Sequence, residues 1–90
     1  MNSKERKKKQ LGMNPSTASH RLKKSLLFEF AKRLGLNWCY QCGAEIEDIN
    51  KFTVEHKTPW MNSPNPKGLF FDLDNIAFSH ASCNYSVVRI

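Results

Sequence analysis

Four side chains that can bind a metal ion occur in this chain as two short hooks, separated by about forty residues. The first hook is Cys39-x-x-Cys42, followed directly by Gly43, and the second is His80-x-x-Cys83. Together they offer three thiols and one imidazole, the donors that a closed tetrahedral zinc site needs. A zinc ion bound by both hooks would join the two ends of the intervening segment. No other feature of the sequence constrains the fold as strongly.

A chain of 90 residues forms one domain plus tails, and so small a core commonly needs a disulfide, a metal or a partner to stay folded. The three cysteines are an odd number, which does not suit a disulfide framework. A redox Cys-x-x-Cys pair is expected within a strand–helix–strand unit, and the sequence shows no such unit. We therefore predict a structural zinc held by Cys39, Cys42, His80 and Cys83 in a reducing compartment.

The chain lacks the marks of membrane insertion or export. No apolar run approaches the ~18 residues of a membrane span, and no hydrophobic stretch follows the basic N-terminus closely enough to form a signal peptide. We expect a soluble cytoplasmic protein without a membrane partner.

The net charge of +6 is unevenly distributed. Residues 1–34 carry a net charge of +8, whereas residues 35–90 carry −2. A basic segment attached to a slightly acidic module is typical of a protein in which one part holds a polyanion and the other acts on it. The alternative is a solvated tail that only maintains solubility. The predicted nucleic-acid contacts are Lys7, Lys8, Lys9, Arg21, Lys23, Lys24, Lys32 and Arg33.

The sequence divides into three parts. Residues 1–12 are rich in lysine without an apolar period and predict a flexible basic arm. Residues 13–35 predict a basic amphipathic helix that opens at Pro15, ends near Leu34 and has Gly35 just beyond its end. This helix could be an ordinary amphipathic helix that covers a small core, and its exposed basic side could also contact phosphates. Its predicted apolar face consists of Leu22, Leu26, Leu27, Phe30, Ala31 and Leu34.

Residues 36–90 predict a compact module. A strand is expected over residues 52–57, which are rich in β-formers, and a second over residues 76–79. Three prolines make residues 58–68 a loop, onto which residues 69–71 are expected to pack. A turn is predicted at residues 74–75 and a closing helix from His80 to about Val88. The predicted class is α+β.

Four polar residues lie between or beside the hooks, namely Glu55, His56, Asn75 and Asn84. Taken singly, each has an ordinary explanation as a surface, turn or helix residue. A histidine can accept a proton from water near neutral pH, however, and a carboxylate beside it can hold a divalent cation.

Taken together, the run Cys39-x-x-Cys42-Gly43, Thr53-Val54-Glu55-His56, Asp74-Asn75-Ile76 and His80-x-x-Cys83-Asn84 resembles the HNH endonucleases, which are ββα-metal or His-Me finger nucleases. The basic helix before the first hook is similar to that of small phage-type members. The resemblance covers residues 38–86 and implies a basic amphipathic helix followed by a zinc-stapled ββα-metal module.

The resemblance also implies a function and a role for each residue. His56 aligns with the general base and Asn75 with the residue that braces the loop and orients this histidine. Glu55 and Asn84 align with the ligands of a catalytic Mg²⁺ or Mn²⁺ ion, and the zinc is purely structural. The implied reaction is DNA phosphodiester hydrolysis, as an endonuclease or nickase.

Two positions differ from the family's commonest form. His80 stands where cysteine is usual, and Asn84 replaces the last histidine of the motif.

The alternative function is a non-catalytic, zinc-containing DNA-binding module, and a third possible function is that of an accessory protein of a phage assembly. By analogy with the family, the partners are DNA and phage packaging or recombination machinery, in a bacterial host cell, with the chain a monomer or weak dimer.

Overall fold

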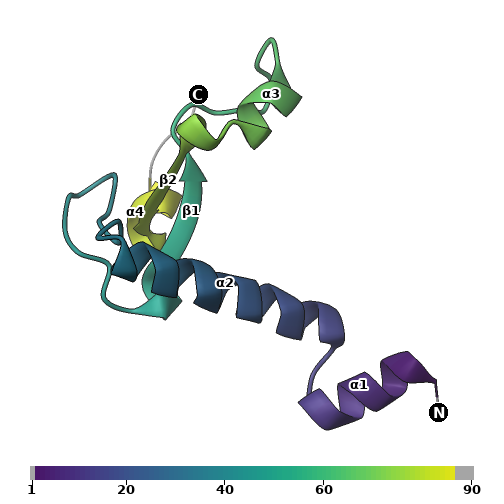
Figure 1. Cartoon of the computed structure of the whole chain (residues 1–90). Coiled ribbons are helices and arrows are strands. Elements are labelled where there is room, and N and C mark those ends of the chain that lie inside the picture. Colours follow the sequence, from purple (N-terminus) through teal and green to yellow (C-terminus); the bar gives the residue numbers. More distant parts are fainter. Residues whose placement is uncertain (1, 87–90) are drawn as a thin grey trace.

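The computed structural model describes residues 2–86, in which two helices precede a two-stranded hairpin and a short closing helix (Figure 1). The second N-terminal helix meets the hairpin near one of its ends, the first projects away from it, and a small helix lies beyond the other end of the hairpin. The elements are α1 (Ser3–Leu11), α2 (Pro15–Arg33), the 3-10 turn η1 (Ile49–Lys51), β1 (Phe52–His56), α3 (Pro66–Phe71), the 3-10 turn η2 (Leu73–Asn75), β2 (Ile76–His80) and α4 (Ala81–Ser86).

The hairpin is antiparallel, with Phe52 opposite His80 at one end and His56 opposite Ile76 at the other. Both strands were predicted from their β-branched and aromatic residues, and both are confirmed. Since α4 begins directly after β2, the second hook lies where the strand becomes a helix. The predicted α+β class and its ββα module are confirmed, whereas the expected end of the last helix near Val88 lies outside the described residues.

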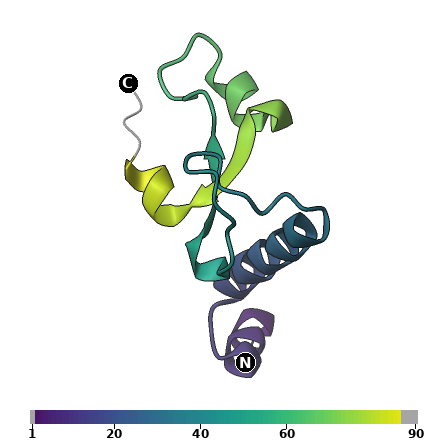
Figure 2. The ribbon, with the colours of Figure 1, turned by 90° about the vertical axis from the view of Figure 1, so that its left-hand side faces the viewer.

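The core of the described residues is small and lies where α2 crosses the hairpin (Figure 2). The rings of Phe28 and Phe52 lie 4.9 Å apart between centroids, and Phe78 lies 5.0 Å from Phe52 on the other side. The buried hydrophobic residues within residues 2–86 are Phe28, Ala31, Cys39, Ile46 and Phe52. Cys39 therefore belongs both to this core and to the first hook.

The predicted boundaries of α2 are confirmed, but its predicted core face is wrong. Asn14 caps the helix before Pro15, and Gly35 follows it with a φ of 70°. Of the predicted apolar face only Ala31 is buried. Phe28, which was not predicted to belong to this face, is also buried and packs on Phe52 of β1. A 19-residue helix is about 28 Å long, whereas a five-residue strand spans about 17 Å. The hairpin therefore covers only part of α2 and leaves exposed Leu22, Leu26, Leu27, Phe30 and Leu34.

Two segments predicted to be irregular are helical in the structure. Residues 3–11 form α1, because Asn2 caps its first turn and Gly12, with a φ of 70°, ends it. Lysine is a good helix former, and α1 buries none of its residues. In the second segment Asn65 caps α3, whose first residue is Pro66, so that the helix includes the predicted packing segment 69–71.

The fold is elongated rather than spherical. Its radius of gyration is 16.1 Å, whereas a compact domain of this length has about 12 Å. Figure 1 shows the reason, since α1 projects away from the hairpin at one end and α3 lies at the other. Within residues 2–86 no helix is long and apolar enough to cross a membrane.

Candidate active site and metal cluster

The first hook is a tight turn built by backbone hydrogen bonds. The Cys39 N–H donates to the Ala44 carbonyl at 2.8 Å, and the Gly43 N–H donates back to the Cys39 carbonyl at 2.8 Å. Gly43 has a φ of 77°, a backbone conformation that favours glycine. The Tyr40 N–H donates to the Phe78 carbonyl at 2.8 Å, which attaches the turn to β2.

The two hooks come together as predicted. The ligand atoms of Cys39, Cys42, His80 and Cys83 all lie within 4.8 Å of one another. The Nδ1 atom of His80 is 3.4 Å from the Cys42 sulfur, and its Nε2 atom is 3.2 Å from the Glu45 carbonyl oxygen. A carbonyl can only accept, so Nε2 carries the proton and the Nδ1 lone pair faces the cluster. Three thiols and a correctly oriented imidazole fit a structural zinc ion.

Two thiols of the cluster, those of Cys39 and Cys83, have perturbed pKa values. Burial raises the pKa of Cys39, but backbone N–H groups of Cys42, His80 and Gln41 directed at its sulfur outweigh burial and lower the pKa to about 6. Burial and hydrogen bonds with the Cys39 and Cys42 sulfurs raise the pKa of Cys83 to about 11. A thiolate already present at neutral pH makes this cluster attractive to a cation, and metal binding would release the remaining thiol protons.

Glu55, the next-to-last residue of β1, is buried, with 3% of its surface exposed. The Gln41 side-chain amide donates to Oε1, and the Ser79 hydroxyl donates to Oε2 at 3.0 Å. Gln41 lies between the two cysteines of the first hook, so the metal cluster and this carboxylate are linked by one side chain. Ser79, which is fully buried, fixes the other oxygen from β2.

His56 ends β1, and its ring lies against the segment that follows the strand. Nε2 is 3.0 Å from the Phe70 carbonyl oxygen, and the His56 and Phe70 rings lie 4.9 Å apart between centroids. Because the carbonyl accepts, Nε2 donates and the neutral ring carries its lone pair on Nδ1. The aromatic ring of Trp60 lies 6.4 Å away and packs edge-on against Phe70.

Asn75 holds the loop that follows β1. Its amide nitrogen donates to the Thr58 carbonyl at 3.0 Å and to the Leu69 carbonyl at 3.1 Å, while its oxygen accepts from the Thr58 N–H at 2.8 Å. The residue is only 6% exposed, so these hydrogen bonds are made away from solvent. It thus ties the loop after His56 to the segment that contacts the His56 ring.

Glu55, His56 and Asn84 line one hollow of about 510 Å³, and Asn75 does not. Asn84 reaches the hollow from α4, where its amide nitrogen donates to the Thr53 hydroxyl at 3.3 Å. Pro59, Trp60, Met61 and Asn62 from the loop after β1 form the opposite part of the lining. Three of the four predicted site residues therefore meet in one cavity, while the fourth supports the loop at its edge.

The predicted nucleic-acid contacts are spread over three regions. Lys7, Lys8 and Lys9 lie on α1, while Lys23 and Lys24 line a second hollow between α2, β1 and α4. Lys32 and Arg33 form ion pairs with Glu29 at 3.3 and 3.1 Å, and the Arg21 guanidinium is 3.9 Å from the Met13 sulfur.

Sequence reasoning missed Gln41, Ser79 and Asn37. Asn37, which is buried, donates to the Ile46 carbonyl and to Glu45, whose own carbonyl contacts His80. The sequence did contain indications of Gln41 and Ser79. Gln41 lies inside the first hook, and a strand pairing that sets Thr53 opposite Ser79 puts Ser79 next to Glu55 on one face.

The fold and the site together define a ββα module with a cluster of three cysteines and one histidine and with a carboxylate–histidine pair on its first strand. The model of the HNH endonuclease family matches residues 39–87, more than half of the chain, and the chain belongs to this family. The predicted resemblance is thereby confirmed, and it indicates a DNA-binding nuclease, that is, a phosphodiester hydrolase. No curated protein and no solved structure matches the chain. The phage-type assignment stays a prediction.

Proposed function

We propose that the chain is a metal-dependent DNA endonuclease or nickase that uses His56 as its general base. The observation that carries the proposal is that Glu55, His56 and Asn84, on two separate elements, line the same hollow. A hollow of about 510 Å³ that contains a carboxylate, an imidazole and an amide can admit a phosphodiester group.

Glu55 and Asn84 are the residues that would hold the catalytic cation. A carboxylate and an amide carbonyl are hard oxygen donors, which suit Mg²⁺ or Mn²⁺ and not the zinc of the sulfur cluster. The hydrogen bonds from Gln41 and Ser79 hold the Glu55 carboxylate in place, and that from Asn84 to Thr53 orients the amide group. When bound, such an ion stabilises negative charge on the scissile phosphate and the departing 3′ oxygen.

His56 would take a proton from the attacking water at Nδ1. The Phe70 carbonyl supports this role, because its hydrogen bond with Nε2 fixes the tautomer that leaves Nδ1 able to accept. The same carbonyl would stabilise the imidazolium that forms. Hydrolysis by this route leaves a 5′-phosphate and a 3′-hydroxyl. Asn75 acts as a positioning residue, because it braces the loop that carries the Phe70 segment.

A plasmid assay with the purified protein tests the proposal. Wild-type protein with Mg²⁺ or Mn²⁺ is expected to convert supercoiled plasmid to the nicked or linear form, and EDTA to stop the reaction. The His56→Ala variant is expected to lose at least about 100-fold in rate, the usual contribution of a general base.

Equal cleavage by wild type and His56→Ala would remove His56 from the mechanism. DNA binding without cleavage in the presence of any divalent metal would favour the alternative of a non-catalytic zinc module. The gel also separates single-strand nicking from double-strand cleavage, since nicked and linear plasmids migrate differently.

A further inference from the structure

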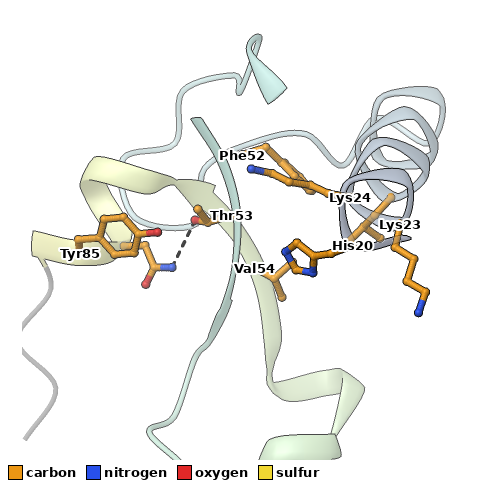
Figure 3. Close-up of a pocket in the computed structure, with 9 residues that line it drawn as sticks. His20, Lys23, Lys24, Phe52, Thr53, Val54 and Tyr85 are labelled. Atoms are coloured by element: carbon orange, nitrogen blue, oxygen red, sulfur yellow. Dashed lines mark hydrogen bonds between the residues drawn. The ribbon is translucent and has the colours of Figure 1, made fainter. Parts of the chain in front are cut away.

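A second hollow, of about 480 Å³, lies between α2, β1 and α4 and is not part of the site described above (Figure 3). His20, Lys23 and Lys24 border it from α2, and Tyr85 borders it from α4 on the other side of β1. Val54, which is 43% exposed, contributes to its floor. The hollow exists because α2 covers only the Phe52 end of β1.

This basic hollow adjoins the candidate catalytic hollow. Both are lined by Val54 and Asn84, so they meet at a proposed ligand of the catalytic cation. At its other end, His20 and Lys23 also line a third, shallower hollow beside Pro15, Ser16 and Ser19. The three hollows form a track that leads from His56 across β1 and along α2 toward its N-terminus.

The lining of the basic hollow suits a nucleotide chain. Two lysines and a histidine are on one wall, and no acidic residue is among the described residues that line it. Tyr85 is 79% exposed, so its ring is open to an incoming base. Cationic side chains that follow phosphates, together with an aromatic ring on which a base can stack, are the usual means of holding a single nucleic-acid strand. By contrast, Lys32 and Arg33 share Glu29 at the far end of α2.

We propose that this basic hollow binds the DNA strand on one side of the scissile phosphate. Lys23 and Lys24 contact backbone phosphates, and the Tyr85 ring contacts a base or sugar. The proposal rests on the proposed function, since its occupant is the nuclease substrate. It divides the basic residues of α2 into a substrate-binding group at the hollow and a group at the C-terminal end that does not contribute to substrate binding.

Binding measurements in a His56→Ala background, with Mg²⁺ and a short labelled DNA, test the proposal without cleavage. The double variant Lys23→Gln/Lys24→Gln is expected to weaken binding about tenfold or more and to reduce the slope of log K against log salt concentration by about 2. Lys32→Gln/Arg33→Gln removes the same charge from the same helix and is expected to weaken binding less than threefold. Equal weakening by the two double variants would overturn the proposal.

The contribution of Tyr85 is tested by a pair of substitutions. Tyr85→Ala is expected to weaken binding at least threefold, while Tyr85→Phe keeps the ring and the affinity. Tyr85→Ala binding as tightly as wild type would show that no base or sugar is held there. Zinc content and circular dichroism of each variant confirm that it is folded.

Because the basic hollow would hold DNA on only one side of the scissile phosphate, a separate test uses protein that retains His56 and can cleave DNA. Shortening the DNA on one side of the cut is expected to abolish the difference between wild type and Lys23→Gln/Lys24→Gln, whereas shortening the other side leaves the difference intact. A difference that persists whichever side is shortened would contradict the proposal. If wild-type protein cleaves nothing but the Lys23/Lys24 effect on binding remains, the proposed catalysis fails and the binding site stands.

Discussion

At the scale of single residues, the candidate site depends on neighbouring backbone and side-chain groups that hold its functional side chains in place. The Glu45 carbonyl sets the tautomer of His80, and the Phe70 carbonyl sets that of His56. Gln41 and Ser79 hold the two oxygens of Glu55 from different elements. Asn75 makes three hydrogen bonds with backbone groups of the surrounding loop. Such supporting contacts commonly matter nearly as much as the groups they orient.

Asn75→Ala is the substitution that tests this support. It leaves the Thr58 and Leu69 backbone groups without their side-chain partner, so we expect unfolding to become easier by about 2–3 kcal/mol. Because the loop beside His56 loses its brace, cleavage should fall by about 10–100-fold while zinc content is unchanged. Urea unfolding, metal analysis and the plasmid assay measure the three quantities.

Asn65→Ala provides the control, because Asn65 caps α3 through a local hydrogen bond to Gly68. We expect a loss of about 1 kcal/mol and cleavage close to wild type. If Asn75→Ala cleaves DNA as fast as Asn65→Ala, Asn75 does not position His56.

At the scale of elements, α2 has two different functions along its length. Near its C-terminal end Phe28 and Ala31 pack on the hairpin, and the preceding turns lie beside the basic hollow. The leucine pattern indicated one continuous buried face, but a two-stranded hairpin is too short to cover it. The periodicity of a sequence shows that a helix has an apolar side, and only the size of its neighbour decides how much of that side is buried.

The two substitutions Phe28→Ala and Leu22→Ala distinguish these regions of α2. Phe28 is 6% exposed and packs on Phe52, so truncation should cost about 3–5 kcal/mol of unfolding free energy. Leu22 is 61% exposed, and its truncation should change the unfolding free energy by less than about 0.5 kcal/mol. Urea denaturation of both variants measures the difference. Comparable losses would show that the leucine face is buried in solution.

At the scale of the whole molecule, we expect the stability of the fold to depend on zinc bound by the Cys39/Cys42/His80/Cys83 cluster. The buried hydrophobic core of the described residues contains only five side chains, and one of them is the ligand Cys39. Structural zinc sites in small domains supply roughly 10–16 kcal/mol of apparent binding free energy, which is also folding free energy. The elongated shape agrees with this, since neither α1 nor α3 contains a buried residue.

Removing zinc with a strong chelator is therefore expected to unfold the module and abolish cooperative thermal unfolding. Added Mg²⁺ should not restore activity to the zinc-free protein, whereas Zn²⁺ followed by Mg²⁺ should. Among single substitutions, His80→Ala should lose zinc, and His80→Cys, which supplies a fourth thiolate, should retain it. Native mass spectrometry measures the zinc content. A folded, reduced chain without zinc would contradict this prediction.

Features of this protein that depend on local spacing could be predicted from the sequence alone. The two hooks, the strands, the ends of α2 and the order of Glu55, His56, Asn75 and Asn84 could all be recognised, because metal ligands, strand formers and helix caps act over a few residues. The helicity of residues 3–11 was not predicted, because no apolar pattern marks a helix that buries none of its residues.

Which distant groups meet could not be predicted from local spacing, because these contacts form only when the elements pack together. Folding of the hairpin brought Ser79 beside Glu55, put Asn84 in the hollow with His56, and left Val54 uncovered between two lined hollows. These contacts depend on strand register and on how much of β1 the helix α2 covers. Register and coverage follow from the packing of whole elements around a small core, which single-residue patterns do not contain.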